Sequence, residues 1–237
     1  MSDQIVVVTG AAGALGSTLV RTLAARGDPV AALDVPRAHD ALQALAGELG
    51  ALVLPLAADV SSAQSWASAL SHIEARLGTP TAAALIAGGW AGGAPLHATS
   101  DDDAFDRMRA ANLDTVHRSL RALLPGMVSR QRGSVVVVGS RAVERPWESA
   151  GAASYAASKA AVVAMARVAA AETIDHGVRI NAVLPSVIDT PANRAAMADA
   201  DPGKWVSQAG LVDVIAFLLS DAAREVTGAA IPVYGRV

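Results

Sequence analysis

A glycine-rich turn between an apolar strand and a helix constrains this chain more than any other segment. Ile5–Val8 is a continuous β-branched run, typical of a parallel strand that is covered on both faces. The turn Thr9–Gly16 follows it, and Ser17–Arg26 has the composition and period of a helix. Glycines in such a turn let the backbone approach a pyrophosphate, and the helix N-terminus supplies free N–H groups. The order favours a dinucleotide site, with a plain strand-to-helix turn as the alternative.

An acidic residue after the second expected strand bears on which dinucleotide fits. Val30–Leu33 reads as a strand and ends in Asp34, about twenty residues after the glycines, where a carboxylate accepts hydrogen bonds from the adenosine ribose. A carboxylate there repels a 2′-phosphate, so we favour NAD(H) over NADP(H). Arg37 is close enough in the sequence to weaken this preference, so NADP(H) stays open. A cap for the helix expected over Arg37–Leu49 is the alternative role of Asp34.

A third strand is expected over Leu52–Ala57 and is followed by Asp59 and Val60. A helix then runs from a serine N-cap to about Leu77. Asp59 is expected either to reach the adenine edge or to cap that helix.

The tryptophans concentrate in the loops that follow strands. The fourth expected strand, Ala82–Ala87, breaks into Gly88–Gly93, where four glycines surround Trp90. Trp147 and Trp205 fall after the fifth and sixth expected strands, Ser134–Val138 and Arg179–Leu184. Ligands of open α/β sheets bind outside the carboxyl ends of the strands, so we expect the three loops to border one crevice. We expect a flat or ring-shaped substrate to stack on at least one of the rings. Packing of a lid or of a subunit contact is the alternative.

A tyrosine and a lysine one helical turn apart form the candidate acid–base pair. Tyr155 and Lys159 are four residues apart on an expected helix and therefore share one face. A fixed cation beside a phenol favours its ionised form and lowers its pKa toward the range useful for proton transfer. By itself the spacing is also common on solvated faces. Asn112 is a lone amide in the long helix expected up to about Arg130, and Ser140 follows the strand expected over Ser134–Val138.

Strands alternate with helices along the whole chain, which predicts a right-handed, doubly wound parallel sheet. The length of 237 residues fits a single α/β domain over residues 1–237. The polar stretch 186–210 is too long for a plain connection and is expected to form a substrate lid with short helices.

Composition and charge exclude several classes of protein. The 52% hydrophobic and 17% charged fractions argue against disorder, and the net charge of −3 argues against a nucleic-acid partner. Without cysteine the chain has no disulfide and no thiolate metal site, and its histidines lack metal-ligand spacing. Met1–Gln4 lacks a basic n-region, and the most apolar run, Ala160–Ala171, is too short to span a bilayer. We expect a cytoplasmic protein that is not attached to a membrane and binds no metal.

With these segments in place, the sequence resembles the short-chain dehydrogenase/reductase family over essentially its whole length. The matching residues are Thr9 to Gly16, Asp59, Asn112, Ser140, Tyr155, Lys159, Asn181, Pro185 and Thr190. The resemblance implies a Rossmann-type parallel sheet of about seven strands flanked by helices. It also implies assembly as a homodimer or homotetramer through the helices that carry Asn112 and Tyr155.

The resemblance implies a role for each catalytic candidate. Tyr155 would be the general acid in carbonyl reduction and the base in the reverse direction. Lys159 would lower the pKa of Tyr155 and hold the nicotinamide ribose. Ser140 would bind the substrate oxygen, and Asn112 would support a water chain behind Lys159.

Two sets of binding residues follow from the motifs and the resemblance together. Trp90 and Trp147 are expected to contact the substrate. The residues expected to bind the cofactor are Gly10, Gly13, Leu15, Gly16, Asp34, Asp59, Val60, Ala87, Gly88, Tyr155, Lys159, Pro185, Ile188 and Thr190.

Several departures from the family pattern are similar to dihydropteridine reductases within that family. They are Ala14, Ile86, Ser186 and the run Ala87–Gly93. Ser140, which those enzymes lack, keeps an ordinary carbonyl or alcohol substrate open. The expected function is therefore hydride transfer between NAD(P)(H) and a small ring-containing carbonyl, alcohol or dihydropterin. The alternatives are an oxoacyl-type or general carbonyl reductase and a non-catalytic dinucleotide sensor.

Overall fold

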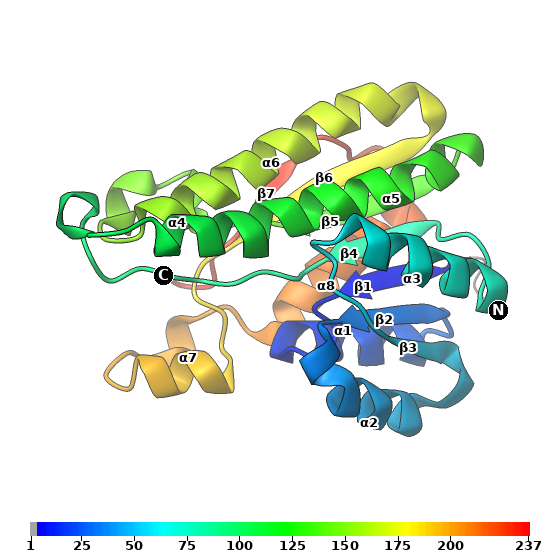
Figure 1. The fold of residues 1–237 in the computed structure, drawn as a ribbon, viewed down its shortest axis with the longest axis horizontal. Helices are drawn as coiled ribbons and strands as arrows, with labels where there is room; N and C mark the ends of the chain where they lie inside the picture. The colour runs from blue at the N-terminus through cyan, green and yellow to red at the C-terminus, as the bar shows by residue number, and fades with distance from the viewer. Residues whose placement is uncertain (1–3) are drawn as a thin grey trace.

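Seven strands pair into one parallel sheet, in the order β3-β2-β1-β4-β5-β6-β7, in the computed structural model that describes residues 4–237 (Figure 1). The strands are β1 (Val6–Thr9), β2 (Val30–Asp34), β3 (Val53–Ala57), β4 (Ala82–Leu85), β5 (Gly133–Val138), β6 (Val178–Pro185) and β7 (Ala230–Val233). The doubly wound parallel sheet predicted from the alternating pattern is confirmed, and so is the number of about seven strands that the family resemblance implies. The prediction that a secretory signal is missing concerns mainly residues 1–3, which lie outside the described part of the chain.

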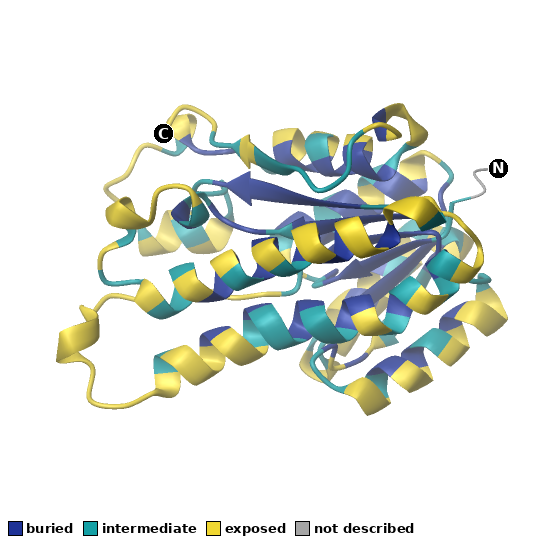
Figure 2. Ribbon diagram, turned by 90° about the horizontal axis from the view of Figure 1, so that it is seen from above, coloured by how far each residue is buried: buried dark blue, intermediate teal, exposed yellow. Residues whose placement is uncertain are grey.

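Helices cover both faces of the sheet, so the strands are buried on two sides. The helices are α1 (Ala14–Ala25), α2 (His39–Leu49), α3 (Ala63–Arg76), α4 (Asp103–Met108), α5 (Thr115–Ser129), α6 (Ala153–Thr173), α7 (Pro191–Ala196) and α8 (Gln208–Leu219). Successive strand residues point to opposite faces. Val6 and Val8 therefore pack with residues of α1, α2 and α8, whereas Val7 packs with residues of α3, α5 and α6. Figure 2 shows the buried side of these helices turned toward the strands.

The strand order reverses between β1 and β4. From β1 the chain steps outward to β2 and β3 and then returns to place β4 on the other side of β1. Such a switch point leaves a crevice at the carboxyl ends of the two central strands, because the connections leave them in opposite directions. The glycine turn after β1 and the loop after β4 therefore meet at one place.

The stretch between β6 and α8 leaves the sheet and returns to it. It contains the short helix α7 and a 3₁₀ turn at Pro202–Lys204, which agrees with the expectation of short helices. A bridge between Ile188 and Val206 closes its base. Figure 1 shows α7 set apart from the sheet, near the edge where the strands end. In the part of the chain that the structure describes, no helix combines the length and the apolar character needed to cross a membrane.

Asn181 on β6 ties the sheet to the loop before β7. Its side chain is fully buried, its Nδ2 donates to the carbonyl oxygen of Val226 at 2.8 Å, and its Oδ1 accepts from the N–H of Ala229 at 3.0 Å. The amide thus satisfies two backbone groups that the edge strand leaves open.

Replacing Asn181 with alanine is expected to lower the free energy of unfolding by roughly 2–4 kcal/mol, because two buried backbone groups lose their partner. Urea unfolding at a fixed protein concentration measures the change. The control is Gln43→Ala on the exposed side of α2, which should stay within about 0.5 kcal/mol of the unmodified protein. A similar small change for Asn181→Ala would contradict the assigned role.

Candidate active site

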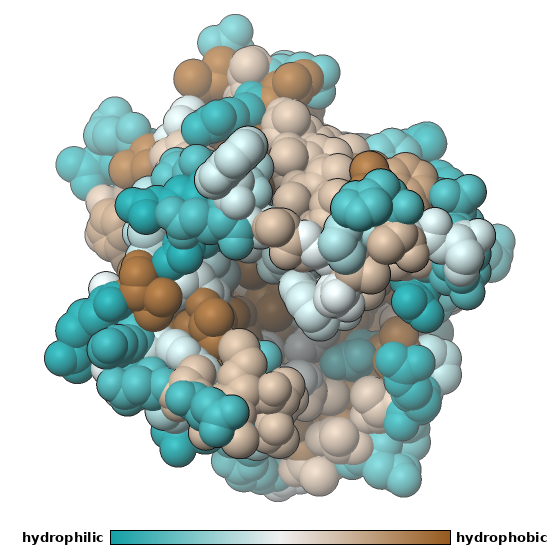
Figure 3. Space-filling model, turned by 90° about the vertical axis from the view of Figure 1, so that its left-hand side faces the viewer, coloured by the Kyte–Doolittle hydropathy of each residue, from teal (hydrophilic) through white to brown (hydrophobic). Residues whose placement is uncertain are grey.

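A cleft of about 680 Å³ lies at the switch point of the sheet. Figure 3 looks at the side where the strands end and shows that this face is hollowed, with apolar residues in its depth. Ten of the fourteen residues expected to bind a cofactor line the cleft, namely Gly10, Gly13, Leu15, Gly16, Asp34, Asp59, Val60, Ala87, Gly88 and Thr190. Pro185, Ile188, Tyr155 and Lys159 are not part of its lining.

The turn after β1 has the geometry of an anion cradle. Gly10 adopts a φ of +69°, and a Cβ there would lie 2.9 Å from the amide nitrogen of Ala87. A Cβ on Gly16 would lie 2.1 Å from the carbonyl oxygen of Gly10, so only glycine allows this approach of α1 to the turn. Gly13 is the N-cap of α1 and brings no side chain to occupy the first N–H groups. The helix N-terminus therefore faces the cleft with its own donors, and a pyrophosphate fits there.

Asp34 joins the second strand to the glycine turn. Its Oδ2 accepts from the N–H of Ala12 at 2.9 Å, and its Oδ1 accepts from the N–H of Val35 at 2.8 Å. The alternative role as a cap for the following helix is not what the structure shows, because α2 begins after Ala38 without a side-chain cap. The carboxylate instead sits in the wall of the cleft, where Arg37 is also found.

Asp59 also shapes a turn at the cleft. Its Oδ1 accepts from the N–H of Ser61 at 2.9 Å and from the Ser61 hydroxyl at 2.7 Å. The N-cap of α3 is Ser62, whose hydroxyl accepts from the N–H of Ser65. Asp59 therefore does not cap α3 itself, and it remains exposed along the wall beside the buried Val60.

Sequence reasoning missed part of the cleft wall. Ala111 and Thr115 also line it, and the Thr115 hydroxyl donates to the carbonyl oxygen of Ala111 at 2.8 Å, so the two residues lie close together. Their position beside Asn112 is a signal that could have identified them. Thr9 was noted only within the turn, yet its hydroxyl accepts from the N–H of Ala87 at 3.2 Å and joins β1 to the loop after β4.

Tyr155, Lys159 and Ser140 come together where β5 ends against α6. Ser140 is buried and its Oγ accepts from the N–H of Ala142 at 3.2 Å, which starts a short 3₁₀ turn. Lys159 is only 6% exposed, and its Nζ donates to the carbonyl oxygen of Val138 at 2.8 Å. Tyr155 is half-buried in the first turns of α6. The fixed spacing of the helix thus places the phenol and the ammonium against the end of one strand.

The pKa shifts differ from the expectation for an isolated pair. Burial raises the pKa of Tyr155, and the nearby Ser140 hydroxyl lowers it in part. Burial also lowers the pKa of Lys159 to about 8. The net shift of the Tyr155 pKa is therefore opposite in direction to the lowering expected from Lys159, because the ammonium is directed to Val138 and desolvation of the phenol outweighs the other effects.

Asn112 lies in a π-helical segment that interrupts the long helix expected up to Arg130. The segment covers Arg109–Asp114, between α4 and α5. The buried Asn112 side chain accepts from the N–H of Gly89 at 2.9 Å and donates to the Gly89 carbonyl at 3.1 Å. It also donates to the Ser158 hydroxyl at 3.0 Å. A Cβ on Gly88 would lie 2.7 Å from Asn112 Oδ1 and 3.4 Å from Lys159 Nζ, so these three residues share one small space.

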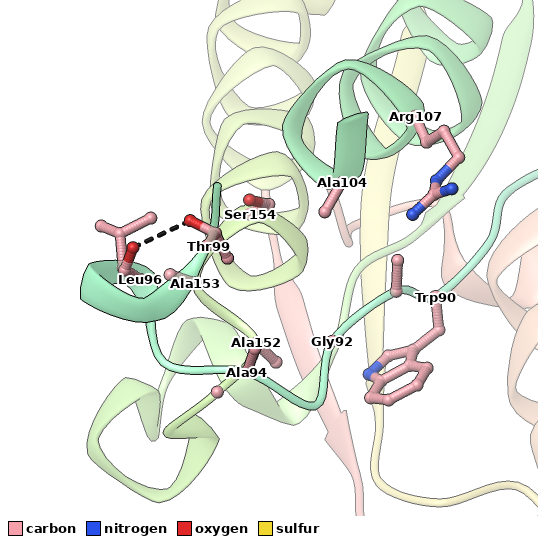
Figure 4. Close-up of a pocket in the computed structure, with 12 residues that line it drawn as sticks. Trp90, Gly92, Ala94, Leu96, Thr99, Ala104, Arg107, Ala152, Ala153 and Ser154 are labelled. Carbon is pink, nitrogen blue, oxygen red and sulfur yellow. Dashed lines mark hydrogen bonds between the residues drawn. The ribbon is translucent and has the colours of Figure 1, made fainter. Parts of the chain in front are cut away.

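The tryptophans do not border a single crevice. Trp205 is buried, and the ring of Trp147 is 94% exposed in the loop after β5. Trp90 is 65% exposed and lines a second, smaller pocket of about 160 Å³ between the loop after β4, α4 and the start of α6. Figure 4 shows this pocket, with Arg107 and Ala104 projecting from α4 and Ser154 from α6. Trp90 therefore lines a pocket that reaches Ser154, the residue before Tyr155.

Known proteins are similar to this chain over almost its whole length. The sequence profile of the family described as short chain dehydrogenase matches residues 4–201. A 3-oxoacyl-[acyl-carrier-protein] reductase of Pseudomonas aeruginosa is 33% identical, with 99% of this chain and 97% of that protein covered. The cis-4-hydroxycyclohexanecarboxylate dehydrogenase of Sinomonas cyclohexanicum is also 33% identical, with 99% and 96% covered.

Two solved structures show the same architecture. An oxidoreductase of the short chain dehydrogenase/reductase family from Burkholderia thailandensis superposes with a TM-score of 0.85 and 34% identity, covering 99% of this chain and 92% of that one. A 3-ketoacyl-(acyl-carrier-protein) reductase from Brucella melitensis complexed with NADH has a TM-score of 0.88 and 25% identity, covering 99% and 98%.

The lowered pKa of Lys159 predicts a pH-dependent stability. Its pKa is about 8 in the fold and 10.5 in the unfolded chain, so between these values the unfolded state binds more protons and unfolding becomes less favourable as pH rises. Relative to Lys159→Met, the unmodified protein should gain on the order of 1–3 kcal/mol between pH 8 and pH 10. Denaturant titrations of both proteins across this range measure the difference. A difference that does not change with pH would contradict the burial of a titrating ammonium.

Proposed function

Because this chain belongs to the short-chain dehydrogenase family and is an oxidoreductase, we propose that it transfers a hydride between NAD(H) and a small ring-containing carbonyl or alcohol. The proposal rests on the observation that two sites lie side by side at one edge of the sheet. A glycine cradle for a pyrophosphate opens beside the buried Ser140, Lys159 and Asn112 and the half-buried Tyr155. A protein that only senses a dinucleotide has no need of these four residues.

The cofactor residues fit a nicotinamide dinucleotide. The α1 N-terminus and the turn at Gly10 would hold the pyrophosphate, and Asp34 would accept hydrogen bonds from the adenosine ribose. Asp59 and Val60 would border the adenine. When bound, the dinucleotide supplies the hydride for carbonyl reduction or accepts it in alcohol oxidation.

Tyr155 would act as the general acid on the substrate oxygen. Its raised pKa keeps the phenol protonated at neutral pH, so that it can donate its proton as a carbonyl oxygen gains negative charge. In the reverse direction the ionised phenol would take the proton of the alcohol. The Ser140 hydroxyl, at the end of β5, would donate a hydrogen bond to the same oxygen and so stabilise the developing charge.

Lys159 and Asn112 would support this step. Lys159 would hold the nicotinamide ribose, and an ammonium released from Val138 toward the phenol would favour the ionised form needed in alcohol oxidation. Asn112 would fix the loop after β4 through both backbone groups of Gly89. Asn112 would also support the water chain behind Lys159 that the family resemblance implies.

The substrate class rests on Trp90 and on one relative. The exposed ring of Trp90 lines the pocket beside the start of α6, where it could stack on a planar or cyclic group. A relative 33% identical is named for a substrate with a cyclohexane ring. A dihydropterin is the narrower form of this proposal, based on the run Ala87–Gly93; the relatives described above are reductases and dehydrogenases of other substrates.

An oxoacyl thioester is the second candidate substrate. It is favoured by the 33% identity to the Pseudomonas aeruginosa reductase over almost the whole of both chains.

Four further expectations from the sequence stay predictions. They are a cytoplasmic location, a lid over residues 186–210, substrate contact by Trp147 and assembly as a homodimer or homotetramer.

Loss of reduced cofactor absorbance should accompany turnover of at least one carbonyl substrate. The assay uses NADH or NADPH against cyclic ketones, a quinonoid dihydropterin and a 3-oxoacyl thioester. Tyr155→Phe should lower kcat about 10²- to 10⁴-fold, because the general acid is removed. Binding of NADH, followed by its fluorescence, should persist in this variant. Full activity of Tyr155→Phe would refute the proposed mechanism.

Cofactor preference should depend on the charge of Asp34. In Asp34→Asn the repulsion of a 2′-phosphate is removed while an oxygen remains to accept from the N–H of Ala12, so kcat/KM with NADPH should rise at least about tenfold relative to NADH. The matched control is Asp40→Asn, an exposed carboxylate on α2 that does not line the cleft. Equal preference ratios in the two variants would show that Asp34 does not select the cofactor.

A further inference from the structure

The C-terminal segment from Val233 to Val237 contacts both ends of the stretch between β6 and α8. Near the start of that stretch, the N–H of Ser186 donates to the carbonyl oxygen of Val233 at 3.2 Å. The Ser186 hydroxyl donates to the carbonyl oxygen of Tyr234 at 2.7 Å. Near its end, the N–H of Arg236 donates to the carbonyl oxygen of Lys204 at 2.9 Å. The tail therefore joins the two points at which this stretch leaves and rejoins the sheet.

Gly235 makes the second of these contacts possible. It has a φ of +66°, and a Cβ there would lie 2.8 Å from the carbonyl oxygen of Lys204 and 3.0 Å from that of Trp205. A side chain at this position would push the tail away from the buried Trp205. This close approach fixes the backbone of the C-terminal segment at Gly235. It thereby sets the direction in which the side chain of Tyr234 projects.

The side chain of Tyr234 reaches the loop between β5 and α6. Its hydroxyl donates to Glu144 Oε2 at 2.7 Å, and the Arg145 guanidinium carbon lies 5.9 Å from the centre of its ring. Burial and the Glu144 carboxylate raise the pKa of Tyr234 to about 12, so the phenol remains a donor at neutral pH. Tyr234 and Val143 both pack against the hydrophobic core on one face of the sheet.

The loop that Tyr234 holds is bound together by its own ion pairs. Arg141 lies 2.6 Å from Glu148, and Arg145 lies 3.2 Å from the same carboxylate. The loop begins directly after Ser140 and leads into α6, which carries Tyr155. Because these ion pairs hold residues 141–149 together, the loop would shift as a unit if the hydrogen bond between Glu144 and Tyr234 were lost.

We propose that Tyr234 is a positioning residue that links loop 141–149 to the 186–206 stretch through Glu144, and so holds in place the loop that connects Ser140 to the helix of Tyr155. The kinetic consequence rests on the proposed function, whereas the structural link does not. Because β5 and α6 anchor the two ends of the loop, loss of the link should alter substrate binding more than the chemical step.

The test compares Tyr234→Phe with the unmodified protein. Phenylalanine keeps the ring beside Arg145 and removes only the hydroxyl. Amide hydrogen exchange in residues 141–150 should accelerate in the free protein. With an active carbonyl substrate, KM should rise about three- to tenfold, as expected for one surface hydrogen bond to a charged group, while kcat changes less than about twofold.

Variants of Glu144 identify the partner. Glu144→Ala should reproduce the effect of Tyr234→Phe, and Glu144→Gln, which keeps an acceptor oxygen, should restore most of the parent KM. The double variant Tyr234→Phe/Glu144→Ala should be no worse than either single change, because both remove one interaction. A remote control is Glu48→Gln, which alters the exposed ion pair with Arg21 and should change neither KM nor exchange in the loop.

The outcomes separate this inference from the proposed function. If no carbonyl compound is reduced but exchange in the loop still accelerates, the reaction is wrong and the link stands. If exchange and KM are the same in Tyr234→Phe and the unmodified protein, the link is wrong even though the enzyme is active. Additive effects in the double variant would likewise exclude a Tyr234–Glu144 link.

Discussion

The close approach of two backbones at the switch point is the constraint on which the rest of the structure depends. The turn at Gly10 and the start of the loop after β4 at Ala87 can be neighbours only without a side chain at position 10. That contact sets where the N-terminus of α1 meets the cleft. It also sets the path by which Gly88 and Gly89 reach Asn112. The cradle for a cofactor and the cluster of polar residues are therefore two results of one arrangement of backbone.

Sequence reasoning recovered the features that follow from local pattern. The β-branched runs and the alternation of strands with helices specify a parallel sheet, and the order of strand, glycine turn and helix locates the cleft. Most of the residues expected to bind a cofactor line it. The fold and the position of the cleft were predictable because the relevant residues are close together in the chain or are placed by the ends of neighbouring strands, whereas cofactor binding by these residues stays a prediction.

Features that depend on side-chain direction and burial could not be predicted in this way. The sequence places Tyr155 and Lys159 on one face of α6, but it does not show that the ammonium bonds to Val138 or that burial controls both pKa values. It gives three tryptophans in three loops, and only the packing distinguishes the buried Trp205 from the exposed Trp147. The contact between Tyr234 and Glu144, 90 positions apart, has no local signal.

The π-helical segment at Arg109–Asp114 has a consequence for how this chain can change in length. Such a segment is an α-helix that has accommodated one additional residue. Removing a residue would restore regular winding, but each residue of an α-helix advances the chain by about 100° around the helix axis. The faces of α4 and α5 would then no longer point as they do now, and Met108 and Asn112 could not both stay buried. The number of residues in this segment is therefore as restricted as their type. This holds although the segment lies within a helix and contains no glycine or proline.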